Sequence, residues 1–178
     1  MRRLTVALAG LLVCALCAGS TNAGAATRSQ QQALHWLGSQ IGVYQQTTWH
    51  FQRLMGVAKS PTTGDSLAEL GVHGAKVALR RWQRLATVAR RRAQRPPHRA
   101  ALLCIHRFEG GWSDAGGPYW GGLQMDLGFQ AHYGGWLLRK KGTANNWTPI
   151  EQMWTAEKAI RSRGFHPWPN TARYCGLI

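Results

Sequence analysis

The chain has 178 residues, of which 44% are hydrophobic, and it carries a formal net charge of +15 together with nine tryptophans. This length and this apolar share exclude a chain too polar to bury a core, and they suit one domain with a smaller additional part. The charge indicates polyanionic surroundings and leaves nucleic acid, an anionic lipid surface and an anionic cell wall open as partners.

The first residues have the layout of a secretory signal peptide, which we predict to cover residues 1–25. Two arginines precede an apolar run from Leu4 to about Ala18, and small residues follow up to Ala25, where cleavage is expected. A membrane anchor is the alternative, but the run is shorter than the roughly 20 residues that a spanning helix needs. We therefore expect the protein to be exported.

Export changes what the four cysteines imply. Cys14 and Cys17 leave with the signal peptide, and neither follows the small residue expected at a lipoprotein site. Cys104 and Cys175 remain, and an isolated pair in an oxidising compartment is most simply a disulfide. It would close a loop of about 70 residues and contribute roughly 4 kcal/mol in the chain-entropy model. Two buried free thiols are the alternative.

Residues 26–97 are predicted to form a basic helical region or linker. Apolar residues at three-to-four spacing predict a helix over Thr27–Gln46, a second short helix over Trp49–Val57, and a longer one over His73–Gln94. Two consecutive prolines then stop the pattern. No repeat and no extended alternation of β-branched residues is visible, so the fold class is predicted to be mainly α.

The longest of these helices is rich in arginine, and no acidic residue interrupts the chain from His73 to Arg99. A solvated helix face is the ordinary explanation for such a pattern. The alternative is an electrostatic clamp on an anionic polymer. Nucleic acid ranks third, because no recognition motif is present and export is expected.

A further helix is predicted over Arg99–Glu109, with Phe108 on its apolar stripe, and Gly110-Gly111 end it. Glu109 therefore stands at the end of an apolar helix in a chain that has only seven acidic residues. Taken alone, such a carboxylate is ordinarily solvated or paired with an arginine.

The residues after Glu109 favour a more specific interpretation. Trp112, Tyr119 and Trp120 follow among glycines, and Gln124 comes next. Glycines let a ligand approach the backbone closely, flat rings can stack on sugars or bases, and an amide both donates and accepts hydrogen bonds. A saccharide cleft typically combines an acid, several aromatic rings and an amide with backbone that no side chain covers. Packing of the rings in a core is the alternative.

Five motifs stand in order along this part of the chain. They are Cys104…Glu109-Gly110-Gly111-Trp112, Tyr119-Trp120-Gly121-Gly122-Leu123-Gln124, Gly134-Gly135-Trp136, Glu151-Gln152…Ala156-Glu157-Lys158 and Trp168-Pro169…Cys175. Together they resemble the transglycosylase-like domain of the resuscitation-promoting factors, secreted muralytic proteins of actinobacteria and their relatives. The resemblance covers about Arg99 to Ile178.

The resemblance implies a small, mostly helical, lysozyme-like domain over residues 98–178 that cleaves β-1,4 bonds between N-acetylmuramic acid and N-acetylglucosamine in peptidoglycan. It implies Glu109 as the catalytic acid and a sugar groove lined by Trp112, Tyr119, Trp120 and Gln124. It also implies a location in the bacterial cell envelope with glycan strands as partners. We expect a monomer, and the charge of the basic helix makes anionic wall polymers candidate partners for that helix. No cofactor or metal is expected, since the histidines are scattered.

Two departures from the family pattern affect this interpretation. The family places one cysteine immediately before the glutamate and the other two residues after Trp-Pro, whereas Cys104 and Cys175 are each displaced by four residues. A displacement of about one helical turn keeps the same helix face, so we expect one disulfide moved along the helix. The stretch from Glu109 to Gln124 is also slightly shorter, so the loop over the groove is expected to differ.

Most glycosidases use two carboxylates, and the partner of Glu109 is open. Asp114 and Asp126 are candidates, whereas Glu151 and Glu157 look like residues of a helix surface or first turn, with Glu151 in a capping box. A mechanism with a single carboxylate fits the resemblance better. The alternatives to an enzyme are a wall-binding module without activity and a cationic exported protein that acts on membranes or nucleic acid.

Overall fold

The structure, a computed structural model, describes residues 20–62 and 64–178, with side chains from residue 27 onward. Most of the predicted signal peptide, with Cys14 and Cys17, lies outside this part. The described residues form helices, no β-strand and one isolated bridge between Trp120 and Met125, so the prediction of a mainly α fold is confirmed. None of these helices is both long and apolar enough to span a bilayer.

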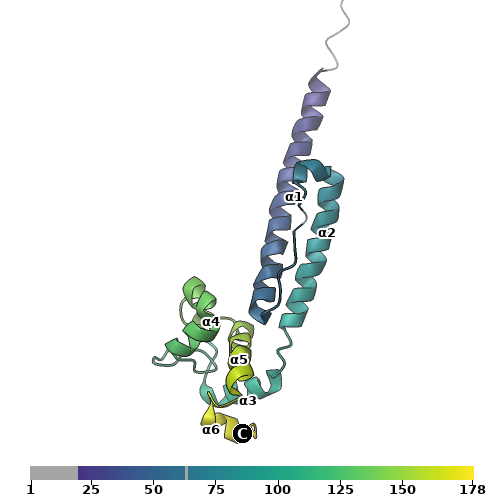
Figure 1. The fold of residues 1–178 in the computed structure, drawn as a ribbon. Coiled ribbons are helices and arrows are strands. Elements are labelled where there is room, and N and C mark those ends of the chain that lie inside the picture. The colour runs from purple at the N-terminus through teal and green to yellow at the C-terminus, as the bar shows by residue number, and fades with distance from the viewer. Residues whose placement is uncertain (1–19, 63) are drawn as a thin grey trace, which may run out of the picture.

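Two long antiparallel helices form a hairpin that extends away from a smaller globular part (Figure 1). They are α1 (Ser20–Met55) and α2 (Leu67–Ala93). α2 approaches α1 through a face of mostly small side chains at helical spacing, so the two backbones can lie close together. The buried residues of that face are Ala75, Trp82, Ala86, Ala89 and Ala93. The ring of Trp49 meets that of Trp82 edge-on at 5.7 Å between centroids.

The predicted division of α1 into two helices is wrong, because the helix runs on without a break. Thr47 and Thr48 stand between the predicted segments, and β-branched residues lower helix propensity. Their hydroxyls donate hydrogen bonds of 2.9 and 2.7 Å to carbonyls one turn earlier, and Thr48 is fully buried. Tertiary packing therefore outweighs the local preference.

α2 also differs from its predicted bounds, since it begins at Leu67 rather than at His73 and ends one residue earlier. Ser66 and Glu69 form a capping box that starts the helix. Gly71 then interrupts it with a left-handed φ of 59°, and the helix continues beyond this kink. The periodic pattern of the sequence shows only the part that follows the kink.

The globular part consists of α3 (Arg99–Glu109), α4 (Leu127–Lys141), the 3₁₀ helix η1 (Ala144–Asn146), α5 (Pro149–Arg163) and α6 (Pro169–Tyr174). The predicted bounds of α3 are confirmed. α5 lies at the centre, and every residue from 151 to 157 is buried.

Only part of the apolar stripe that was predicted for α3 faces the core. Leu102 and Ile105 are fully buried, whereas Phe108, which was expected on the apolar stripe, is 54% exposed. Its ring lies beside that of Tyr174, with 5.8 Å between the centroids. Leu102 and Ile105 are three residues apart and therefore lie on the same, buried face of the helix. Phe108 follows three residues later, in the last turn, where the helix ends.

The predicted disulfide between Cys104 and Cys175 is present, with 6.0 Å between the Cα atoms. It ties the middle of α3 to the residue after α6. The two helices that meet at Glu109 are therefore held together covalently.

The base of the hairpin shares its hydrophobic core with the globular part. Leu54, Met55 and Ala93 belong to the same buried cluster as Leu102. The indole nitrogen of Trp154 on α5 donates a 2.7 Å hydrogen bond to the carbonyl of Ala93. Removing the hairpin would therefore expose part of this core to water.

Candidate active site

Two adjoining cavities form a groove along the face where α3, α6 and the loop before α4 meet. One, of about 330 Å³, is lined by Glu109 together with Pro169 and Asn170. The other, of about 150 Å³, is lined by Asp126, Phe129 and Arg163 among others. Both cavities share the same four wall residues, so they adjoin, and together they are called the groove. The shared residues are Tyr119, Gln124, Pro167 and Trp168.

Glu109 is the acid at one end of this groove. The hydroxyl of Thr171, a buried residue of α6, donates a 2.7 Å hydrogen bond to Oε1 of Glu109. No ion pair among the described residues involves this carboxylate. Of the two ordinary explanations for an acid at a helix end, pairing with an arginine does not hold among the described residues, and solvation of the carboxylate stays as the alternative.

A second carboxylate and an amide lie next to Glu109, around the backbone of Gly110. The Nε2 of Gln124 donates to Oδ2 of Asp114 at 2.9 Å and to the carbonyl of Gly121 at 3.0 Å. A methyl group on Gly110 would come within 3.0 Å of that Asp114 oxygen and 3.2 Å of the Gln124 nitrogen. Gly110 also has a φ of 148°, so both its conformation and its surroundings call for glycine.

The other predicted sugar-binding rings are placed differently. Tyr119 lines both cavities and is 48% exposed. Trp112 instead stacks on His106, with 3.9 Å between ring centroids, and Trp120 packs against Gly117. Neither of these two tryptophans is among the residues that line the groove. The structure therefore brings Glu109, Tyr119 and Gln124 together and leaves the two indole rings as supports behind them.

Several groove residues were not singled out as site residues by sequence reasoning. Trp168 contributes its ring to both cavities, and its indole nitrogen is fixed by a 2.8 Å hydrogen bond to the carbonyl of Leu123. The Trp-Pro motif was the signal that could have identified it. No such signal marks Phe129 and Arg163, which line the groove, or Thr171, which contacts Glu109, because only the fold brings these helical residues to the site.

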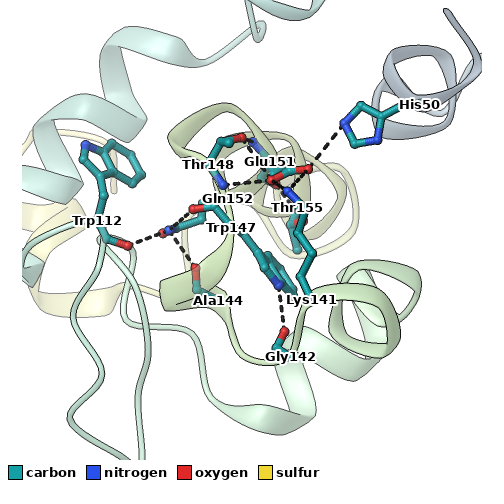
Figure 2. A network of polar contacts seen from close by, with 10 residues as sticks. All are labelled: His50, Trp112, Lys141, Gly142, Ala144, Trp147, Thr148, Glu151, Gln152 and Thr155. Carbon is teal, nitrogen blue, oxygen red and sulfur yellow. Dashed lines mark hydrogen bonds and ion pairs between the residues drawn. The ribbon is translucent and has the colours of Figure 1, made fainter. Parts of the chain in front are cut away.

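Gln152 of α5 holds the loop that forms one wall of the groove (Figure 2). It is fully buried, and its Oε1 accepts a 2.9 Å hydrogen bond from the backbone N–H of Gly122. Its Nε2 lies within hydrogen-bonding distance of the carbonyls of Trp112, Ala144 and Trp147, at 2.8 to 3.1 Å. One amide thus joins the glycine-rich loop to the segment before α5.

Glu151 lies in the first turn of α5 as predicted, but neither Glu151 nor Glu157 is on the helix surface, since they are only 2% and 1% exposed. Glu157 accepts hydrogen bonds from the backbone N–H of His98 at 2.6 Å and lies 2.9 Å from its Nδ1. Neither glutamate lines the groove. Sequence spacing did not reveal their burial because their partners come from distant parts of the chain.

Glu151 is the most strongly perturbed of the described acids. It forms the predicted capping box with Thr148, and it also contacts Lys141 at 2.7 Å and His50 at 3.3 Å (Figure 2). Burial alone would raise its pKa, but hydrogen bonds from His50, Lys141 and Thr148 and the charge of Lys141 outweigh burial and lower the pKa to about 2. The Glu151 carboxylate is therefore ionised at neutral pH and stabilises the fold through its contacts.

Within the part of the chain that the structure describes, no three histidine, cysteine or acidic side chains are grouped as a metal site requires. Comparisons with protein-family models, with curated proteins and with solved structures found no match.

Proposed function

We propose that the protein is an exported enzyme that cleaves the glycan strands of peptidoglycan, with Glu109 as its acid. The observation that carries the proposal is the position of Glu109: it lines a groove, has no cationic partner among the described residues, and is oriented by Thr171. The exposed ring of Tyr119 and the amide of Gln124 lie along the same groove and suit a sugar ring. The resemblance to the resuscitation-promoting factors supports the same substrate.

The proposed reaction uses a single carboxylate. The acid form of Glu109 gives its proton to the bridging oxygen while the bond from the sugar C1 to that oxygen breaks. The carboxylate then takes a proton from the nucleophile that attacks C1. If the 6-hydroxyl group of the same sugar attacks, the product is a 1,6-anhydro sugar; if water attacks, it is a reducing sugar.

The two other acids near the groove are already engaged, which supports this assignment. Asp114 accepts the hydrogen bond from Gln124, and Oδ1 of Asp126 accepts one of 2.7 Å from the backbone N–H of Phe129 at the start of α4. Glu109 is the acid of the groove whose described contacts include no backbone N–H and no amide.

A zymogram on purified cell wall tests the proposal. We expect Glu109→Gln to abolish clearing while the melting temperature stays close to that of the wild type, because the amide is nearly isosteric. Glu69→Gln is the matched control, since Glu69 is an exposed residue of α2 and glutamine can keep its capping box. Clearing by Glu109→Gln at the wild-type rate would contradict the proposal. No clearing by the wild type would favour a binding module instead, and mass spectrometry of the fragments distinguishes the two products.

We propose further that α2 holds the enzyme on anionic polymers of the wall. Lys76, Arg80, Arg84 and Arg91 are exposed at helical spacing along it, and none forms an ion pair among the described residues. The buried face of α2 is packed on α1, which leaves only scattered apolar residues such as Val77 and Val88 for a bilayer, and the helix has no exposed tryptophan, tyrosine or phenylalanine for base stacking. A flexible polyanion is therefore the best partner.

Substitution tests this better than deletion, because the hairpin contributes to the shared core. Changing Arg80, Arg84 and Arg91 together to glutamine should release the protein from walls that retain their phosphate-containing polymers. A control with the same loss of charge outside α2, at Arg107 and Arg139 and at a third exposed arginine such as Arg161, should keep binding. Equal release of both variants would contradict a specific role of α2.

A further inference from the structure

A separate cavity of about 170 Å³ lies where the base of the hairpin meets the globular part. Its walls include the side chains of Arg53, Lys59 and Lys140, the amide of Gln46, the imidazole of His50 and two indole rings. They come from α1, from the loop after it and from α4. No acidic residue lines this cavity, and it shares no residue with the groove.

None of the three cations of this cavity forms an ion pair among the described residues. The guanidinium of Arg53 lies 4.7 Å from the ring centre of Trp136, and the ammonium of Lys59 lies 5.5 Å from that of Trp49. These ring contacts hold two of the charges at the cavity walls. Like charges that converge on one cavity repel each other, so an anion placed between them would be electrostatically favourable.

Helix dipoles explain only part of this arrangement. Lys140 lies in the last turn of α4 and Arg53 in the last turn of α1, where a cation is favoured on each helix separately. Lys59 is in a loop, so no helix dipole favours its positive charge at this position. The positive potential also acts on a neighbour: burial, then Arg161, then Arg53 lower the pKa of Lys158.

We propose that this cavity binds a phosphate group. The oxygens of a phosphate group are arranged tetrahedrally and suit donors that converge from different directions, whereas the two oxygens of a carboxylate lie in one plane. His50 is already held by Glu151 at 3.3 Å, so Arg53, Lys59, Lys140 and Gln46 are the groups that would bind the anion. Because these groups belong to three segments, a bound phosphate would fasten the hairpin to the globular part.

Thermal unfolding of the mature protein tests the proposal, with inorganic phosphate compared with chloride at equal ionic strength. A ligand that binds only the folded state raises the melting temperature by mass action, so we expect a rise of several degrees that saturates with phosphate. Arg53→Gln combined with Lys140→Gln should lose this rise. Arg139→Gln combined with Arg161→Gln, which removes the same charge from exposed residues outside the cavity, should keep it.

An equal rise in both double variants, or no rise in the wild type, would overturn the proposal, as would acetate acting as well as phosphate. Dimethyl phosphate distinguishes the two sources of the group. If it acts as well as inorganic phosphate, the cavity accepts the phosphodiester of a polymer; if it does not, the ligand is a free phosphate or a monoester. Because the groove is untouched, all variants should clear cell wall as the wild type does if the proposed activity is correct, so the two proposals fail separately.

Discussion

Replacing Glu151 with glutamine should remove a pH-dependent part of the protein's stability. The pKa of Glu151 is lowered from an ordinary value of 4.5 to about 2 in the folded protein. A group whose pKa is lower when folded stabilises the folded state above its unfolded pKa, and the contribution is lost as the pH falls toward its folded pKa. The stabilisation is therefore complete above about pH 5 and disappears toward pH 2.

The magnitude follows from the size of the shift. One pKa unit corresponds to about 1.4 kcal/mol, so a shift of this size contributes about 3 kcal/mol to the free energy of unfolding at neutral pH. Glutamine keeps the shape of the side chain and can keep the capping box, but it removes the charge that Lys141 and His50 face.

Urea unfolding of the wild type and of Glu151→Gln at several values between pH 7 and pH 2 measures this contribution. The difference in unfolding free energy should be constant above pH 5 and should shrink steadily below it. Contributions from the other acids cancel in this difference. If the two curves ran parallel down to pH 2, the carboxylate would not be selectively stabilised in the folded state, and the reasoning would be refuted.

Two further changes have expected results that follow from the structure. Replacing Cys104 and Cys175 by serine should lower the free energy of unfolding by roughly 4 kcal/mol, measured by urea unfolding, because a long loop loses its closure; a loss below about 1 kcal/mol would contradict this. Gly110→Ala should destabilise by about 1–3 kcal/mol and reduce wall clearing, because of its φ of 148° and its contact with Asp114. Gly42→Ala, in α1 with open space around it, should be neutral or stabilising by up to about 1 kcal/mol, and equal effects at the two glycines would show that the surroundings do not matter.

Patterns among neighbouring residues were enough to predict those helices whose start or end is marked by capping residues, prolines or glycines. α3 has an apolar period, and a pair of glycines ends it, while α5 begins with a threonine cap and Pro149, so its start was readable from the sequence. α1 was predicted as two helices because local propensity at Thr47 and Thr48 is weak and their burial is a tertiary effect.

Some residues of the candidate site could likewise be predicted from local patterns, and others could not. Glu109 and Gln124 were predicted because an acid at a helix end and an amide after glycines form a local pattern. Trp112 and Trp120 look equivalent to Tyr119 in the sequence, yet only the fold decides which ring faces the groove and which supports it from behind.

The sequence by itself determined the helical class, the pairing of the two remaining cysteines and the position of the acid at a helix end, because each depends on spacing along one segment or on the count of a residue type. Only the tertiary structure decided that Thr171 orients this acid, that the side chains of Glu151 and Glu157 are buried, and that cations from three segments converge on one cavity. These features depend on contacts between residues far apart in the chain. The local spacing of apolar or charged residues does not predict such contacts.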